Sequence, residues 1–219
     1  IVPARKGSKG VKNKNIIKIK AKPLIEYTFD SINESKLIDG AYLSTDSNKI
    51  GKLTLGHKVL FKYLRPSKYS KSNSPASKVI LYHIDWLKMN KLNIPENIIY
   101  MQPTSPIRRK GFIDDAINFY EKNNSESLIS VSNCFQHPWE FIQLNNKKII
   151  FNKNLKNKNV RQSYEKFFFI TGSIYIFKTS FFLKHLNFYN ENTTAFFTSL
   201  EEAVDIDNII DLKIAECLI

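Results

Sequence analysis

The chain has 219 residues and a formal net charge of +13, from 33 Lys and Arg against 20 Asp and Glu. Its two cysteines and four scattered histidines exclude a disulfide framework and a zinc site, and we expect a cytoplasmic protein. The lysines are spread along the whole chain, and no apolar run approaches the ~20 residues of a membrane span, so neither nucleic acid nor a membrane is the expected partner.

Strands and helices alternate along the chain. Strands are expected at residues 1–2, 41–43, 59–61, 98–101, 128–131 and 172–177. Helices are expected from Pro23, around Ile80–Leu87 and Ile113–Tyr120, and at 209–218 after an Asn208 cap. This order predicts an α/β fold, a mostly parallel sheet between two layers of helices. One domain over residues 1–219 is expected, with a few residues preceding Ile1, because the chain opens inside a strand rather than on Met.

Residues 139–170 break this alternation. The stretch is rich in Lys and Asn, and it holds short β-prone pieces at 141–144, 149–151 and 167–170. We interpret it as a protruding hairpin arm rather than a second domain.

The first fifteen residues, IVPARKGSKGVKNKN, form a basic loop after a short apolar strand. Gly7, Ser8 and Gly10 lie among Arg5 and four lysines. Glycines let backbone N–H groups turn toward a ligand, and fixed cations beside them suit a polyphosphate. The spacing matches neither the dinucleotide-binding nor the P-loop motif. The arrangement predicts a phosphate-binding loop, whereas composition alone favours a solvated Lys/Gly loop.

Asp205 and Asp207 flank Ile206 near the carboxyl end. In an extended segment, residues two apart point the same way, so both carboxylates can face a cleft while Ile206 faces the core. Two carboxylates together with phosphate oxygens make an oxygen-rich Mg²⁺ site. The alternative is that Asp207 belongs to the cap of the last helix. Ligands bind beyond the carboxyl ends of the strands in such sheets, so this pair should lie beside the N-terminal loop.

Separate motifs resemble those of the acylneuraminate cytidylyltransferases, in that family's order. The N-terminal string resembles IPAR-x-GSKG followed by KN, and QPTSPIR at 102–108 resembles QPTSPLR. Arg161-Gln162 resembles the RQ pair of the family's arm, and VDIDN at 204–208 resembles VDIDT-x-x-DL. The resemblance covers residues 1–216. It implies a Rossmann-like nucleotidyltransferase sheet with a protruding β dimerisation arm.

The same resemblance implies a reaction and a set of roles. CTP and a nine-carbon acidic sugar, a nonulosonic acid of the sialic or legionaminic type, would give the CMP-sugar and pyrophosphate in the cytoplasm. The cofactor would be Mg²⁺, and in a homodimer Arg161 would complete the neighbour's sugar site. The implied residues are Arg5 and Lys14 for catalysis; Arg5, Ser8, Lys14, Asn15, Arg65 and Ser74 for the nucleotide; Gln102, Arg161, Gln162 and Thr171 for the sugar; and Asp205 and Asp207 for the metal.

Some positions depart from the family pattern. The loop at 72–77 lacks the usual aspartate, so Ser74 and Ser77 fit helix capping as well as base contacts. Thr171 stands before Gly172 where Asn is frequent. The alternatives are a Kdo- or pseudaminate-type nucleotidyltransferase of the same fold, or a non-catalytic basic protein that binds nucleic acid. A cleft that gathers the cations and both aspartates would favour the enzyme.

Overall fold

The computed structural model describes residues 1–8, 10–151 and 165–219. Seven strands run side by side in the order β5-β4-β1-β6-β10-β7-β11. The first three strands, β5, β4 and β1, form one hydrogen-bonded group, and β6, β10, β7 and β11 form another. Two hydrogen bonds connect the groups: the Ile1 amine donates to the Ile99 carbonyl, and the Met101 amide donates to the Ile1 carbonyl. The strand bounds are Val2–Ala4 (β1), Ala41–Thr45 (β4), Val59–Leu60 (β5), Asn97–Tyr100 (β6), Ser127–Asn133 (β7), Phe168–Lys178 (β10) and Thr194–Phe197 (β11).

The sheet is parallel except around one strand. The β1–β4, β4–β5 and β7–β11 pairs are parallel, whereas β10 runs antiparallel to both β6 and β7. Successive residues of β10 face opposite sides, so Ile174 and Ile176 enter one core while Tyr175 and Phe177 enter the other.

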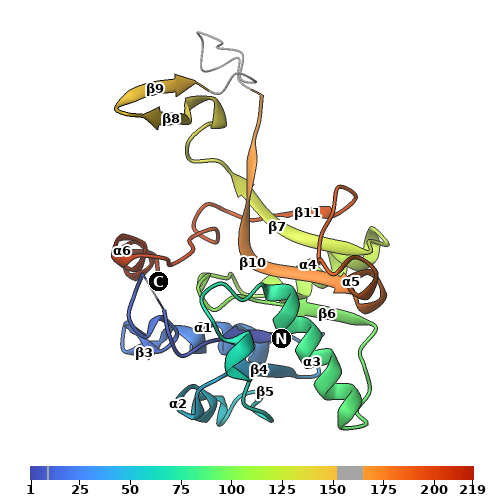
Figure 1. Cartoon of the computed structure of the whole chain (residues 1–219). Helices are drawn as coiled ribbons and strands as arrows, with labels where there is room; N and C mark the ends of the chain where they lie inside the picture. The colour runs from blue at the N-terminus through green and yellow to red at the C-terminus, as the bar shows by residue number, and fades with distance from the viewer. Residues whose placement is uncertain (9, 152–164) are drawn as a thin grey trace.

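Helices cover both faces of this sheet (Figure 1). On one face, α1 (Leu24–Glu34) and α4 (Phe112–Lys122) bury an apolar stripe that includes Phe29 and Phe112. On the other, α3 (Ala76–Met89) and α5 (Thr179–His185) bury Ile80, Ile84 and Phe182. Each fully buried side chain of this size stabilises the fold by roughly 1.5–3 kcal/mol. The expected three-layer α/β/α fold is confirmed.

A smaller apolar cluster holds the carboxyl-terminal segment against the body. The helix α6 (Ile209–Leu218) packs Leu212 and Ala215 beside Ile19 of the short β2–β3 hairpin, which comprises Lys18–Ile19 and Lys22–Pro23. Asn208 caps α6 as expected, and Asp211 completes a capping box. Pro23, expected inside the first helix, instead precedes α1 as its N-cap residue. A four-residue helix α2 (Asn48–Gly51) follows β4.

A two-stranded hairpin, β8 (Ile142–Asn145) and β9 (Lys148–Phe151), stands away from the sheet (Figure 1). Residues 168–170, which we expected in the arm, instead form the first part of β10. They pair with β7, for example Ile170 with Val131, before an irregularity between Ile170 and Tyr175. Across residues 1–8, 10–151 and 165–219, no helix is both long and apolar enough to cross a membrane.

Candidate active site

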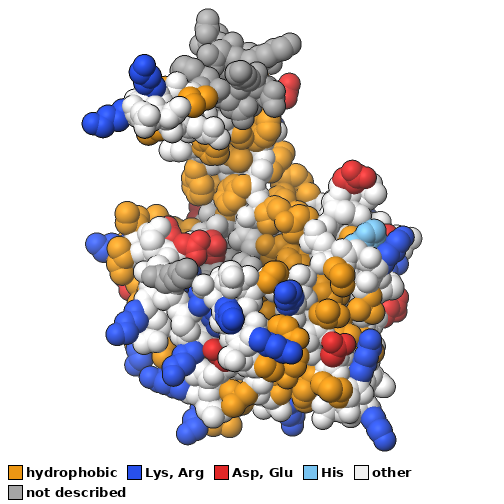
Figure 2. Space-filling model, in the orientation of Figure 1, with side chains coloured by type: hydrophobic (Ala, Val, Ile, Leu, Met, Phe, Trp, Pro, Cys, Tyr) orange, Lys and Arg blue, Asp and Glu red, His pale blue; other side chains and the backbone are white. Residues whose placement is uncertain are grey.

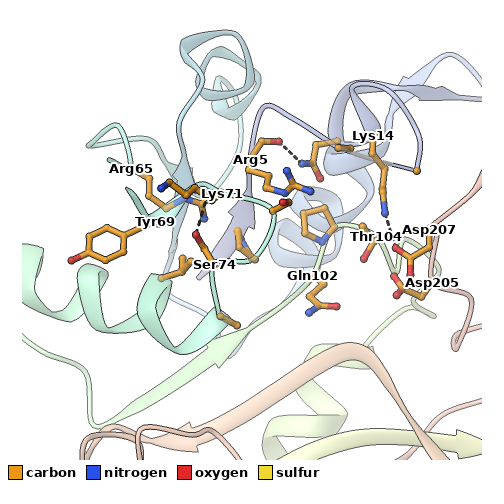
Figure 3. Close-up of a pocket in the computed structure, with 18 of the residues that line it drawn as sticks. Arg5, Lys14, Arg65, Tyr69, Lys71, Ser74, Gln102, Thr104, Asp205 and Asp207 are labelled. Carbon is orange, nitrogen blue, oxygen red and sulfur yellow. Dashed lines mark hydrogen bonds and ion pairs between the residues drawn. The ribbon is translucent and has the colours of Figure 1, made fainter. Parts of the chain in front are cut away.

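A pocket of about 620 Å³ opens beyond the carboxyl ends of β1 and β6 (Figure 3). Most of the predicted site residues line it. They are Arg5, Ser8, Lys14, Asn15, Arg65, Ser74, Gln102, Asp205 and Asp207. The loop after β1, the loop before α3, the turn after β6 and the segment before α6 therefore meet at one edge of the sheet. The aspartate pair lies beside the N-terminal loop, as predicted.

The loop after β1 is held by a hydrogen bond within the loop and by another to the residue that follows β4. The Asn15 side chain is nearly buried and donates to the Arg5 carbonyl at 3.0 Å. On the far side, the Lys6 amide donates to an Asp46 carboxylate oxygen at 2.7 Å, so the end of β4 also anchors the loop. Within the described part of the chain, the Arg5 guanidinium has no hydrogen-bond or ion-pair partner. It is therefore available to an anionic ligand.

Lys14 and the two aspartates form one end of the pocket (Figure 3). Lys14 Nζ lies 2.8 Å from Asp207 Oδ1, and the Asp207 side chain is 76% exposed. Asp205 is much more enclosed, and its Oδ1 is a buried atom without a hydrogen-bond partner among the described residues. Burial raises the pKa of the Asp205 carboxyl, with Thr104 beside it acting in the opposite direction.

Gly10 sets how closely the loop approaches this acidic segment. A Cβ atom at position 10 would lie 1.9 Å from the Asp207 carbonyl oxygen, far inside van der Waals contact. Only glycine permits this approach. The glycine that we singled out for phosphate binding therefore also packs the loop against the aspartates.

The other end of the pocket is formed by Arg65, Tyr69, Lys71 and Ser74 (Figure 3). Arg65 is 4% exposed and donates through Nε to Ser70 Oγ, and burial lowers the pKa of its guanidinium. Ser74 Oγ accepts from the Lys71 amide at 3.1 Å, which closes a turn. The α3 helix has no side-chain cap, so neither Ser74 nor Ser77 caps it.

Gln102 lies on the turn after β6, and β10 fixes its surroundings. Gly172 has a φ of +75°, and a Cβ there would lie 2.7 Å from Gln102 Oε1. The neighbouring Ser105 hydroxyl donates to the Thr171 carbonyl. Glycine at 172 thus allows the bulged strand to approach the Gln102 side chain.

Two of the sugar contacts that we predicted lie outside the described residues, and a third is placed elsewhere. Arg161 and Gln162 fall within 152–164, so their roles stay predictions. Thr171 is 2% exposed, its hydroxyl donates to Ser130 Oγ at 2.8 Å, and it does not line the pocket. The structure therefore gives Thr171 a place inside the sheet rather than at the site.

Several pocket residues were not predicted. They are Tyr69, Lys71, Ser72, Ala76, Val79 and Tyr100. Thr104, which also lines the pocket, belongs to the QPTSP turn that the resemblance singles out. The aromatic and apolar residues carry no motif.

The two aspartates fit a divalent cation shared with a ligand. In residues 1–8, 10–151 and 165–219, no group of three His, Cys, Asp or Glu side chains could hold a metal by itself. Mg²⁺, however, is commonly held by one or two carboxylates plus substrate phosphates. The unpartnered Oδ1 of Asp205 is the kind of buried oxygen that such an ion would satisfy.

Comparisons with known proteins show which proteins this chain is similar to. The model of the family described as Cytidylyltransferase matches residues 1–218. The "Post-translational flagellin modification protein B" of Campylobacter coli is 32% identical over 221 residues, which cover 99% of this chain and 92% of that protein. The "CMP-N,N'-diacetyllegionaminic acid synthase" of Campylobacter jejuni is 31% identical, with the same coverage.

A solved structure supports the fold. The CMP:2-keto-3-deoxy-manno-octonic acid synthetase complexed with CTP has a TM-score of 0.70, with 12% identity, and the match covers 99% of this chain and 95% of that one.

Proposed function

Since the chain belongs to the cytidylyltransferase family, whose model spans residues 1–218, we propose that it activates a nonulosonic acid of the sialic or legionaminic type with CTP. The products are the CMP-sugar and pyrophosphate. The legionaminic choice is supported by the similarity to the Campylobacter jejuni synthase over nearly the whole chain.

One observation carries this proposal: the pocket joins four basic side chains to a carboxylate pair. Arg5, Lys14, Arg65 and Lys71 stand against Asp205 and Asp207. A cationic pocket with a local acidic end suits a triphosphate with its cation. This clustering also favours the enzyme over the basic nucleic-acid binder, which would need a continuous cationic face instead.

In the proposed reaction, the anomeric hydroxyl of the sugar attacks the α-phosphorus of CTP. A new O–P bond forms, the bond from the α-phosphorus to the bridging oxygen breaks, and pyrophosphate leaves as the hydroxyl proton is lost. Such transfers depend mainly on positioning and on neutralising charge. Arg5 and Lys14 would hold the phosphates, Ser8 and Asn15 would shape the loop around them, and Arg65 and Ser74 would face the nucleoside.

On the sugar side, Gln102 would orient the acceptor, Arg161 would meet its carboxylate as a bidentate partner, and Gln162 would also contact the sugar. Asp205 and Asp207 would hold Mg²⁺, which when bound supplies positive charge to phosphate oxygens. We also propose that the protein is cytoplasmic and that it forms a homodimer. The homodimer is supported by exposed apolar side chains beside the hairpin.

The test is a pyrophosphate-release assay with purified protein, Mg²⁺ and CTP. The acceptor panel holds sialic, legionaminic and pseudaminic acids and Kdo, and ATP replaces CTP as a control. We expect CTP-dependent release that is greatest with legionaminic or sialic acid. Release only with pseudaminic acid or Kdo would overturn the choice of sugar, and no release with any acid would overturn the proposed activity.

A further inference from the structure

A buried carboxylate outside the pocket holds the segment that carries the two aspartates. Glu202 precedes Asp205 by three residues, and its side chain is 7% exposed. Its Oε1 accepts from the Arg109 amide at 3.2 Å and from Arg109 Nη1 at 3.0 Å. Its Oε2 accepts from the Ser199 amide at 3.0 Å. Both carboxylate oxygens are therefore used, one toward the start of α4 and one within the segment itself.

The same segment is tied at two further points. The Glu202 carbonyl accepts from the Ser173 hydroxyl at 2.8 Å, and the Ile206 amide donates to the Thr104 carbonyl at 2.8 Å. These bonds reach β10 and the turn after β6. The aspartates are thus positioned relative to the turn that carries Gln102.

Arg108 links the turn that carries Gln102 to β10. Its guanidinium donates to the Ser173 carbonyl at 2.8 and 3.3 Å, to the Gln102 carbonyl at 3.1 Å and to Thr28 Oγ1 at 3.1 Å. Ser173 therefore joins two contacts: its carbonyl meets Arg108 and its hydroxyl meets Glu202. A single buried network connects the Gln102 turn to the aspartate segment.

We propose that Glu202 is a positioning residue that, through Arg109, fixes the Asp205–Asp207 segment against the Gln102 turn; the catalytic consequence rests on the proposed function. Glu202 does not line the pocket. Its effect is on where the two aspartates stand. Contacts that orient metal ligands commonly change metal affinity by about 10–100-fold when removed, and Glu202 acts on the two aspartates through the backbone of their segment.

The chain offers a matched control on the same arginine. Arg109 Nη2 also pairs with Asp115 at 2.8 Å, but the Asp115 side chain is 54% exposed and belongs to α4 rather than to the segment. Asp115→Asn removes one ion pair of Arg109 without touching Glu202. It separates loss of an ion pair in general from loss of the contact to the segment.

The experiment compares Glu202→Gln, Arg109→Gln and Asp115→Asn with the unchanged chain. Gln has one acceptor oxygen and one donor NH₂, so it cannot accept at both ends as Glu202 does. The first readout is hydrogen exchange of the Ile206 amide without ligand. The second is the Kd for Mn²⁺ in the presence of CTP, by electron paramagnetic resonance. The third is the split between kcat and KM in pyrophosphate release.

We expect Glu202→Gln and Arg109→Gln to speed Ile206 exchange and weaken Mn²⁺ binding, each about tenfold. The loss of turnover should appear mainly in kcat, and Asp115→Asn should stay within about twofold of the unchanged chain. Unchanged exchange and Mn²⁺ affinity in both Gln variants would overturn the proposal, as would an equal loss in Asp115→Asn. Hydrogen exchange needs no substrate, so a failure of the proposed reaction would not be mistaken for a failure of the positioning role.

Discussion

Asp205 and Asp207 are two residues apart in the chain, but the fold gives them different surroundings. Asp207 is exposed and paired with Lys14, which compensates its charge. Asp205 has a buried oxygen without a hydrogen-bond partner in the part of the chain that the structure describes, and burial disfavours its ionised form. A buried charge without a partner lowers the stability of the folded state, and such a destabilising residue is typical of functional sites.

We therefore predict opposite effects on activity and on stability for Asp205→Asn. Turnover should fall by about 100-fold or more, because the substitution removes a carboxylate that would hold the cation beside the phosphates. The melting temperature should stay equal or rise, since the buried charge is removed. Asp207→Asn should lower turnover similarly, with a stability change of within about 1 kcal/mol.

Pyrophosphate release across a Mg²⁺ titration and thermal unfolding measure these two quantities. Normal turnover in either Asn variant at all Mg²⁺ concentrations would show that the carboxylate has only a structural role. A large drop in melting temperature for Asp205→Asn would contradict the view that its charge is a cost to the fold.

At the scale of elements, the sequence predicts best where periodicity and a local signal agree. Helix α6 begins after Asn208, as the capping residue indicates, and Ile206 enters the core between two polar aspartates. The prediction that residues 168–170 belong to the arm was wrong, because a β-prone sequence does not indicate which strand it pairs with. The strand β11 was missed because its four residues lie in a polar stretch without alternation.

The candidate site shows the same division. The basic, glycine-containing loop and the aspartate pair led to Arg5, Lys14, Asp205 and Asp207, since these residue types are rarely needed together by a core. The resemblance to the family's QPTSPLR motif led to Gln102. Tyr100 and Val79 reach the pocket only because a strand and a helix bring them there, and ordinary core residues look the same in a sequence. Thr171 matched a motif position, but the bulge in β10 turns its hydroxyl toward Ser130.

Helix α3 contains a buried histidine that gives the fold an acid-sensitive point. His83 is 3% exposed and lies against the rings of Tyr42 and Trp86, and its Nδ1 is 3.0 Å from the Tyr63 hydroxyl. Burial lowers its pKa from 6.5 to about 3. The unfolded chain binds this proton below pH 6.5 and the folded chain does not, so stability is lost as the pH falls from 6.5 toward 3.

We predict that the unchanged protein loses about 2 kcal/mol more stability than His83→Gln between pH 7 and pH 5. Gln keeps a hydrogen-bonding group near Tyr63 but cannot titrate. Urea unfolding at both pH values measures the difference. His185→Gln, at the exposed end of α5, is the control. Parallel curves for the unchanged chain and His83→Gln would show that His83 is not the titrating group.

At the scale of the whole molecule, exposed apolar side chains of β10 and β11, which include Phe168, Ile170 and Phe197, form a neck between the body and the hairpin. Figure 2 shows hydrophobic side chains gathered between the body and the hairpin. Phe168 and Ile170 of β10 are 42% and 41% exposed, and Phe197 of β11 is 59% exposed. The Phe168 and Phe197 rings lie 5.1 Å apart, edge to face, so they form one surface. Contiguous exposed apolar patches of this kind mark protein–protein contacts.

The proposed homodimer places a second copy over this neck, and we predict that charge at its centre breaks the dimer. The double variant Phe168→Asp, Phe197→Asp should elute as a monomer, because a buried carboxylate facing an apolar partner has no compensating charge. Leu55→Asp is the control, since Leu55 is 81% exposed away from the neck and should leave the dimer intact. Size-exclusion chromatography with light scattering gives the masses, and circular dichroism shows that each variant is folded. A dimer that survives the double substitution would place the interface elsewhere, and an unchanged chain that is monomeric at all concentrations would overturn the homodimer itself.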